Sequence, residues 1–240
     1  GATYQVKHMI WDSRAEVRRA QSEDKWGLMS GMVKEVDENW AWSGRTRIFQ
    51  TSSNEPDGTD STEADMRLGL AYRSVQTEWI MLDRLDLLID KHGGGASTDF
   101  TSWRIINNVI GNYRPRKDLQ FSLHYGAKYV LETIFEDDYR GFTDYWGLEG
   151  RYDIDQDWDI GLHGGLFHSW HADQFDYCSG GSVGYKVVKN AWISVGYNLT
   201  GFKDRDFSRA NFTSKGPFVR FRLKFDQDSV GEAAKWVKDQ

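Results

Sequence analysis

The chain has 240 residues, a formal net charge of −6 and a single cysteine, Cys178. Its mean hydropathy is −0.65, and it lacks any run of about 20 apolar residues, which excludes a protein that crosses a membrane with helices. The acidic balance argues against a nucleic-acid partner, and one cysteine excludes an internal disulfide and a cysteine-based zinc site. No signal peptide is recognisable after Gly1, which does not decide the compartment of an exported protein.

Apolar and polar residues alternate with period two along almost the whole chain, which predicts strands. We expect about twelve of them, over residues 3–20, 25–36, 39–52, 62–74, 77–91, 99–114, 118–134, 141–155, 157–171, 175–189, 191–201 and 216–226. The stretch DSRAEVRRAQSED, residues 12–24, has no clean alternation and could be a helix instead. We therefore predict one barrel domain over 1–226, with 1–24 as strand or helix, and a periplasmic tail over 227–240.

The connections between these segments alternate in length. Short ones are expected at 36–39, 74–77, 114–118, 153–157 and 188–190, and long ones at 52–63, 90–99, 133–143, 169–176 and 201–216. This rhythm is typical of an up-and-down bacterial barrel with short periplasmic turns and longer outer loops. The predicted fold class is an all-β, transmembrane, antiparallel barrel.

Most predicted strands have one face free of charge. In GPFVRFRLKFD, residues 216–226, apolar side chains alternate with Arg220, Arg222 and Lys224. A soluble sandwich can show the same alternation, with one face in the core. Two segments, 77–90 and 102–112, are ambiguous, because either face of the first would carry Asp83 or the pair Arg84 and Asp86. A bulge would shift the face.

The positions of the aromatic residues favour the membrane. Rings that sit beside the short turns form a predicted girdle at one interface, where amphipathic rings prefer to lie. Its members are Trp40, Trp79, Trp158, Trp192, Tyr72, Tyr113 and Tyr152. A soluble core would more often hold tryptophan in the middle of a strand.

Charged side chains occupy the opposite face of the predicted strands. Those expected to line the lumen are Arg45, Arg47, Arg67, Arg73, Lys128, Glu149, Arg151, Asp153, Asp159, Arg220, Arg222 and Lys224. One interpretation is a packed interior in which arginine and carboxylate groups satisfy one another. Another is a passage for an anionic or polar substrate, as in a porin. The two can coexist if a plug fills the lumen.

A resemblance rests on four stretches: GLAYR (69–73), LEGRYDIDQDWDIGLHG (148–164), VVKNAWISVGYNLTGFKDRDF (187–207) and GPFVRFRLKFDQDS (216–229). They resemble the C-terminal outer-membrane β-barrel domains of large, repeat-containing surface or envelope proteins of Gram-negative bacteria. The resemblance covers about residues 61–229. It implies an outer-membrane location and a role in anchoring or translocating a larger attached or partner protein, with no catalytic residue and no cofactor.

The last predicted strand ends like the strand that the barrel-assembly machinery reads in outer-membrane barrels. Val219, Phe221, Leu223 and Phe225 look like that signal, although the tail after Phe225 departs from barrels that stop at the last strand. The partners that follow are outer-membrane lipid and lipopolysaccharide, the assembly machinery and a larger envelope protein. The acidic loops 55–63 and 136–138 could bind divalent cations that bridge lipopolysaccharide, but solvated loops are the default.

Other functions stay open as alternatives. An outer-membrane lipase or protease would draw on Ser169, His171, Asp173 and Asp176, but His168 and Ser169 are adjacent and therefore point to opposite faces. His124 and His163 are expected in the lumen as satisfied side chains rather than metal ligands. A soluble all-β glycan-binding domain is the remaining alternative.

Overall fold

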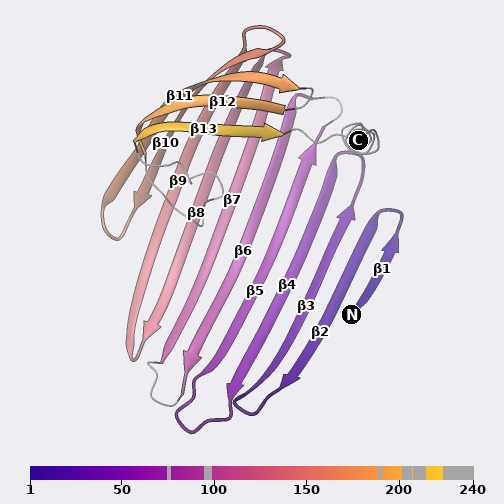
Figure 1. The fold of residues 1–240 in the computed structure, drawn as a ribbon, viewed down its shortest axis with the longest axis vertical. Helices are drawn as coiled ribbons and strands as arrows, with labels where there is room; N and C mark the ends of the chain where they lie inside the picture. The colour runs from indigo at the N-terminus through magenta and orange to yellow at the C-terminus, as the bar shows by residue number, and fades with distance from the viewer. Residues whose placement is uncertain (75–76, 95–98, 189–190, 202–206, 208–214, 224–240) are drawn as a thin grey trace, which may run out of the picture.

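The computed structural model describes residues 1–74, 77–94, 99–188, 191–201, 207 and 215–223, and Figure 1 shows the fold. Every regular element in these ranges is a strand. The strands are β1 (Ala2–Val6), β2 (Met9–Arg19), β3 (Glu23–Glu35), β4 (Trp40–Ser53), β5 (Asp60–Arg73), β6 (Trp79–Gly93), β7 (Phe100–Arg116), β8 (Leu119–Ile134), β9 (Asp137–Asp153), β10 (Trp158–Ser169), β11 (Gln174–Val188), β12 (Ala191–Thr200) and β13 (Gly216–Leu223).

Each strand pairs antiparallel with the next, so the sheet has up-and-down topology from β1 to β13. This confirms the predicted fold class. The predicted segment 3–20 is two strands, because the chain reverses at Lys7 and His8 and β1 pairs back on β2. The helix considered for residues 12–24 is wrong: Trp11, Ser13, Ala15 and Val17 alternate on one face of β2, and β2 pairs with β3 along its whole length. No helix among the described residues is long and apolar enough to cross a membrane.

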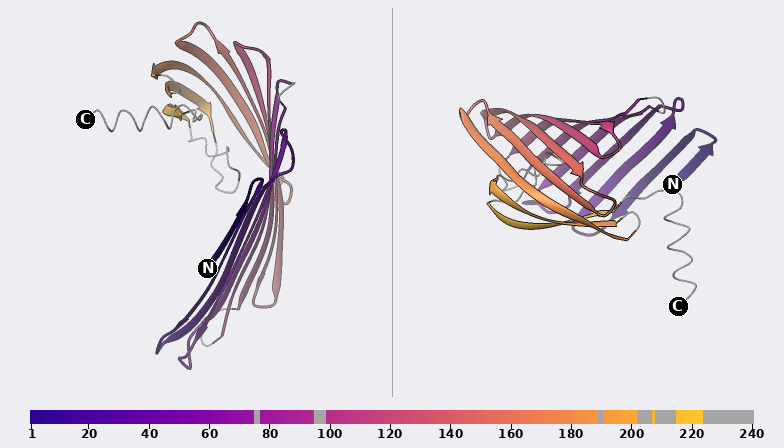
Figure 2. Two further views of the ribbon diagram at one scale, coloured as in Figure 1. Left: turned by 90° about the vertical axis from the view of Figure 1, so that its right-hand side faces the viewer. Right: turned by 90° about the horizontal axis from the view of Figure 1, so that it is seen from above.

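The sheet is curved unevenly. Figure 2 shows a gently curved N-terminal half and a C-terminal half that curls over the concave face, so that β11, β12 and β13 lie across it. In the described part of the chain, β1 pairs only with β2 and β13 pairs only with β12. The sheet is thus an open, strongly curled trough over these residues.

One predicted long loop is strand. The segment 133–143 was expected to connect two strands as an outer loop, but β8 continues to Ile134 and β9 begins at Asp137. Phe135, with a φ of 56°, and Glu136 make the whole turn. Cross-strand pairs such as Thr133–Asp138, whose side chains lie 2.8 Å apart, extend the hairpin, so the charged residues belong to a β ribbon.

Two short turns share a local design that places a tryptophan at the start of a strand. The Asp37 carboxylate accepts hydrogen bonds from the backbone N–H groups of Asn39 and Trp40, at 2.7 and 2.8 Å. Asp155 accepts in the same way from Asp157 and Trp158, both at 2.8 Å. An aspartate that binds the backbone two and three residues on stabilises a tight turn. The sequence motif Asp-x-x-Trp therefore sets the first residue of β4 and of β10.

Candidate functional site

The two faces of the sheet differ in chemistry. The convex face carries most of the exposed apolar side chains of the strands, with Leu162 at 73% and Phe221 at 72% exposure. No described element covers this face, which distinguishes the sheet from a soluble sandwich. The concave face carries nearly all the buried polar groups, including Asp86, Asn108, His124 and Asp159.

The ambiguous strands β6 and β7 pair without a register shift between them, so no bulge moves their faces. Arg84 and Asp86 lie on the concave face, where Asp86 pairs with Arg67 and Arg84. Asp83 consequently lies on the convex face. There the amide of Asn107 donates to its carboxylate at 2.7 Å, a polar pair within an otherwise apolar surface.

The predicted girdle consists of cross-strand ring pairs at the short-turn ends of the strands. Ring centroids lie 4.7 Å apart in Trp40–Tyr72, 4.5 Å in Trp79–Tyr113 and 4.8 Å in Trp158–Tyr185. Tyr152 lies on the same convex face. The prediction missed Tyr185, which is recognisable only through its register opposite Trp158.

Trp192 was wrongly assigned to the girdle. It shares a face with Ser194 and Asn198, which are buried on the concave side, and the guanidinium of Arg222 lies 5.4 Å from its ring centroid. The alternation in β12 had already placed it opposite Ile193 and Val195. The alternation along the strand was a better guide to the face of Trp192 than its position beside a short turn. Residues of both faces lie next to the turn at the end of a strand.

The N-terminal half of the concave face is an array of arginines joined by shared carboxylates. Asp65 binds Arg47 at 2.5 Å and Arg45 at 3.4 Å. Further along, Asp86 is shared by Arg67 and Arg84, and Asp90 binds Arg104 at 2.7 Å. These arginine side chains stay between about a third and a half exposed, so they are positioned by the carboxylates and still face solvent. Sequence reasoning missed Arg84 and Arg104, which lie in the two ambiguous segments.

The C-terminal half carries a buried ion network. Asp159, with only 3% of its side chain exposed, is held between Arg151 and Arg222. Arg151, itself 9% exposed, also donates to Glu149 at 2.8 Å, and Arg220 lies 3.6 Å from the same carboxylate. Pairs this deeply buried need full satisfaction of their charges, and here strands β9, β10 and β13 are tied together by them.

Next to this network lies a small core. Ile106 of β7, Tyr145 of β9 and Phe207 form a buried cluster, with Phe167 packed against it. Phe207 belongs to the connection between β12 and β13, and its ring contacts the backbone at Gly126 so closely that a Cβ there would lie 2.5 Å from it. Lys128 lies 5.5 Å from the centroid of the Phe207 ring.

The two lumen histidines have amide partners. His124 Nε2 lies 3.2 Å from the side-chain oxygen of Asn108, and His163 Nε2 lies 2.9 Å from that of Asn198. No group of three or more potential metal ligands gathers in the described part of the chain. Each of the two rings thus has a side-chain amide partner at Nε2.

The remaining candidates fall at strand ends. Arg73 ends β5, and Asp153 ends β9 with its carboxylate 4.0 Å from Arg114. Val219 and Phe221 lie on the convex face of β13, whose last residue is Leu223. Lys224, Phe225 and the predicted tail 227–240 lie outside the described residues. The assembly signal stays a prediction.

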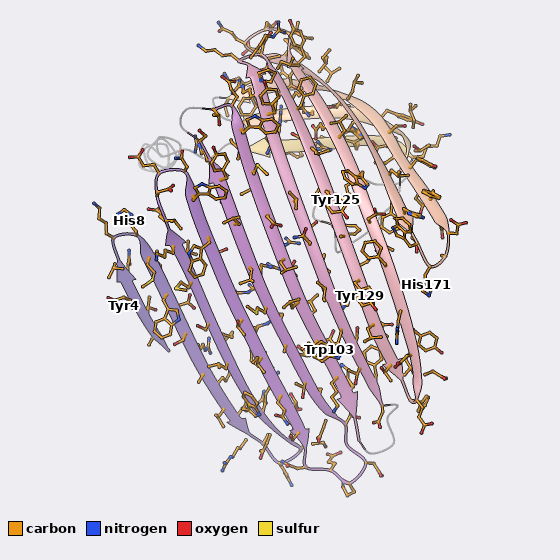
Figure 3. All side chains as sticks on the ribbon, turned by 180° about the vertical axis from the view of Figure 1, so that it is seen from behind. Tyr4, His8, Trp103, Tyr125, Tyr129 and His171 are labelled. Carbon is orange, nitrogen blue, oxygen red and sulfur yellow. The ribbon has the colours of Figure 1, made fainter. Side chains whose placement is uncertain are left out.

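The residues of the hydrolase alternative lie around the turn between β10 and β11. His171 is in the turn itself, where Figure 3 labels it, and it makes no hydrogen bond with Ser169. His168 faces the convex side, stacks on Phe175 at a centroid distance of 4.0 Å and lies 3.8 Å from Asp144. The arrangement does not join a serine nucleophile to a base.

A cavity of about 450 Å³ opens on the concave face at its short-turn end. Its walls include Arg114, Arg151, Asp159, Lys186, Trp192 and Arg222, from strands β7 to β13. Residues more than a hundred positions apart in the sequence thus meet here through the curl of the sheet.

No protein-family model and no curated protein matches the chain. Solved structures are similar to it in shape. The ferric citrate transporter FecA in its unliganded form matches with a TM-score of 0.52 at 10% identity, over 82% of this chain and 40% of that one. The chain has the fold of a transmembrane β-barrel. It spans less than half the length of that transporter.

Two other matches are weaker in superposition and wider in coverage. The NanC porin matches with a TM-score of 0.39 at 12% identity, over 91% of this chain and 100% of that one. The translocator domain of the autotransporter NalP from Neisseria meningitidis gives 0.36 at 8% identity, over 91% and 87%. At these identities the similarity concerns the fold.

Proposed function

We propose that the chain forms the wall of a bacterial outer-membrane barrel that passes small polar solutes and prefers anions. The observation that carries this is the chemistry of the concave face in the N-terminal half. Its arginines remain accessible, with the side chain of Arg47 at 49% and that of Arg67 at 43% exposure. Five arginines of this array face three carboxylates, those of Asp65, Asp86 and Asp90, which leaves positive charge in excess within it. A row of guanidinium groups facing water lowers the cost of an anion beside it.

The outer-membrane location is part of the same proposal. The uncovered apolar face and the ring pairs at one level fit the hydrocarbon layer and its interface. Lipid and lipopolysaccharide would then contact the convex face, and the assembly machinery would read Val219 and Phe221 on the last strand.

A second function has an observation of its own. Phe207 is fully buried against the concave face of β7 to β10, so this half of the trough is packed rather than open. A filled lumen suits a barrel that anchors or translocates a larger attached or partner protein, the role that the sequence resemblance implies. The two functions differ in whether ions pass.

The test is to fold the protein into liposomes and to read heat-modifiable gel mobility together with single-channel conductance and reversal potential. A mobility shift with steady, anion-selective conductance supports the passage, and Arg47→Gln with Arg67→Gln should weaken the selectivity. Lys34→Gln, which removes a charge at the short-turn end of β3, is the control. A shift without conductance favours the anchor. A soluble monomer without a shift contradicts both.

A further inference from the structure

The charged cavity at the short-turn end of the concave face points to a specific ligand. We propose that it binds a small organic anion that also carries hydroxyl groups, which deepens the proposed passage function by adding a selective site at one mouth. Its volume of about 450 Å³ lies in the range of small-molecule sites. The cavity is lined by cations, carboxylates and a tryptophan, and the groups that other side chains do not already engage determine which ligand it can hold.

The carboxylate at the base of the cavity is already paired. Asp159 is buried between Arg151 and Arg222, so both of its carboxylate oxygens are occupied by guanidinium groups. It cannot serve a cationic ligand without losing one of these pairs. Its role is to fix the position of Arg222, whose side chain keeps 35% exposure at the wall.

Two further carboxylates of the lining are also engaged. Asp118 faces Arg116 at 3.3 Å, and Asp155 accepts the backbone N–H groups of its own turn. In contrast, Lys117 and Lys186 line the cavity and form no ion pair within the described ranges. These two lysines are the cations of the lining that no described carboxylate engages, and an ammonium group binds a carboxylate or phosphate through strong charge-assisted hydrogen bonds.

The other available groups select for hydroxyls. Asp157 and Gln120 line the same cavity and offer oxygen acceptors, and Asp153, whose carboxylate lies 4.0 Å from Arg114, offers another. Trp192 adds a flat ring, held in place by Arg222 at 5.4 Å from its centroid. A solute with one oxyanion and several hydroxyl groups would use the lysines, the acceptors and the ring together, whereas a plain inorganic anion would use the lysines alone.

The experiment is isothermal titration calorimetry on the folded protein in detergent, with gluconate, glucose 6-phosphate and glucose as probes. We expect at least one of the two anions to bind, depending on whether the lysines prefer a carboxylate or a phosphate. Glucose should bind far more weakly. Lys117→Gln combined with Lys186→Gln should lower the affinity at least about tenfold, the usual cost of losing charged hydrogen bonds. Lys34→Gln removes the same charge at the same end of the sheet, outside the cavity, and should leave the affinity unchanged.

The outcomes separate this site from the passage. The proposed site is supported if the anions bind to Lys34→Gln but not to the Lys117→Gln, Lys186→Gln double variant, and if Trp192→Leu lowers their affinity. Absence of binding for every probe, or an equal loss in Lys34→Gln, overturns it. Calorimetry does not need an open lumen. If no probe binds but the conductance is anion-selective, the ligand site is contradicted and the proposed passage function is supported. If a probe binds but no conductance is seen, the ligand site is supported and the passage function is contradicted.

Discussion

The two halves of the trough use the same residue types in opposite ways. In β3 to β7, arginines that are a third to a half exposed surround aspartates on a gently curved face. In β8 to β13, the sheet curls over itself, and Arg151 and Asp159 are buried together with Phe207 and Tyr145. Because curvature decides whether a concave side chain meets water or the opposite wall, the same ion pair is a surface feature in one half and a core element in the other.

The sharpest test of this difference is a matched pair of carboxylate substitutions. Asp159→Asn removes the buried carboxylate that Arg151, itself buried, and Arg222 share, and should cost about 3–5 kcal/mol of the free energy of unfolding. Asp65→Asn frees Arg45 and Arg47, which are half exposed and can hydrate, so it should cost about 1 kcal/mol or less. Urea unfolding in detergent measures both. Equal losses would show that the two networks are alike.

A second pair examines packing with one added methyl group. Gly126→Ala places a Cβ 2.5 Å from the Phe207 ring, and overpacking of this kind should destabilise by about 1–3 kcal/mol. At Gly44 in β4 the nearest atoms to a Cβ lie at 3.7 Å, so Gly44→Ala should be neutral. Thermal unfolding followed by circular dichroism compares them. A neutral Gly126→Ala would mean that Phe207 does not pack there.

A third comparison asks whether both halves face lipid. Met66 of β5 and Tyr129 of β8 lie in one cross-strand row through Leu87 and Ile105, so both belong to the apolar convex face. Arginine at either position should cost up to about 2 kcal/mol of folding free energy in liposomes. Refolding yield by gel mobility is the measurement. A harmless Met66→Arg beside a costly Tyr129→Arg would place the N-terminal half out of the hydrocarbon.

The smallest effects should come from the girdle, which the two halves share. Trp79→Leu and Trp158→Leu each remove one ring of a stacked or tilted pair, and aromatic pairs contribute about 0.5–1.5 kcal/mol beyond their area. Both variants should therefore lose similar stability in the liposome assay. Trp192→Leu, on the concave face, should leave the membrane interface unaffected, in contrast to the original girdle assignment.

How much of the fold and the site was predictable depends on the signal. Period-two alternation correctly indicated antiparallel strands, because alternate side chains must point to opposite faces. The alternation was a poor guide where neither face of a strand is uniformly apolar. It predicted one strand where the structure has β1 and β2, and it did not assign Asp83 to a face. The loop expected at 133–143 was a ribbon, since charged residues that stand beyond the apolar band look like loop in sequence.

The candidate site was predictable as a set of residues and not as an arrangement. The sequence predicted Arg151, Asp159 and Arg222 to face the lumen, because each alternates with apolar residues along its strand. It could not find that one aspartate binds both arginines, because strands β9 and β13 meet only through the curl. Phe207 was missed altogether, as nothing in a connection between strands signals a buried ring.

By itself the sequence determined the strand character, the apolar and charged faces, and the turns that begin with Asp37 and Asp155, because these depend on local spacing and on backbone hydrogen bonds within a few residues. Only the tertiary structure decided which charged groups are buried, where the cavity at the short-turn end lies, and that Trp192 belongs to it. These properties depend on how strongly each part of the sheet curves, which is set by contacts among residues far apart in the chain.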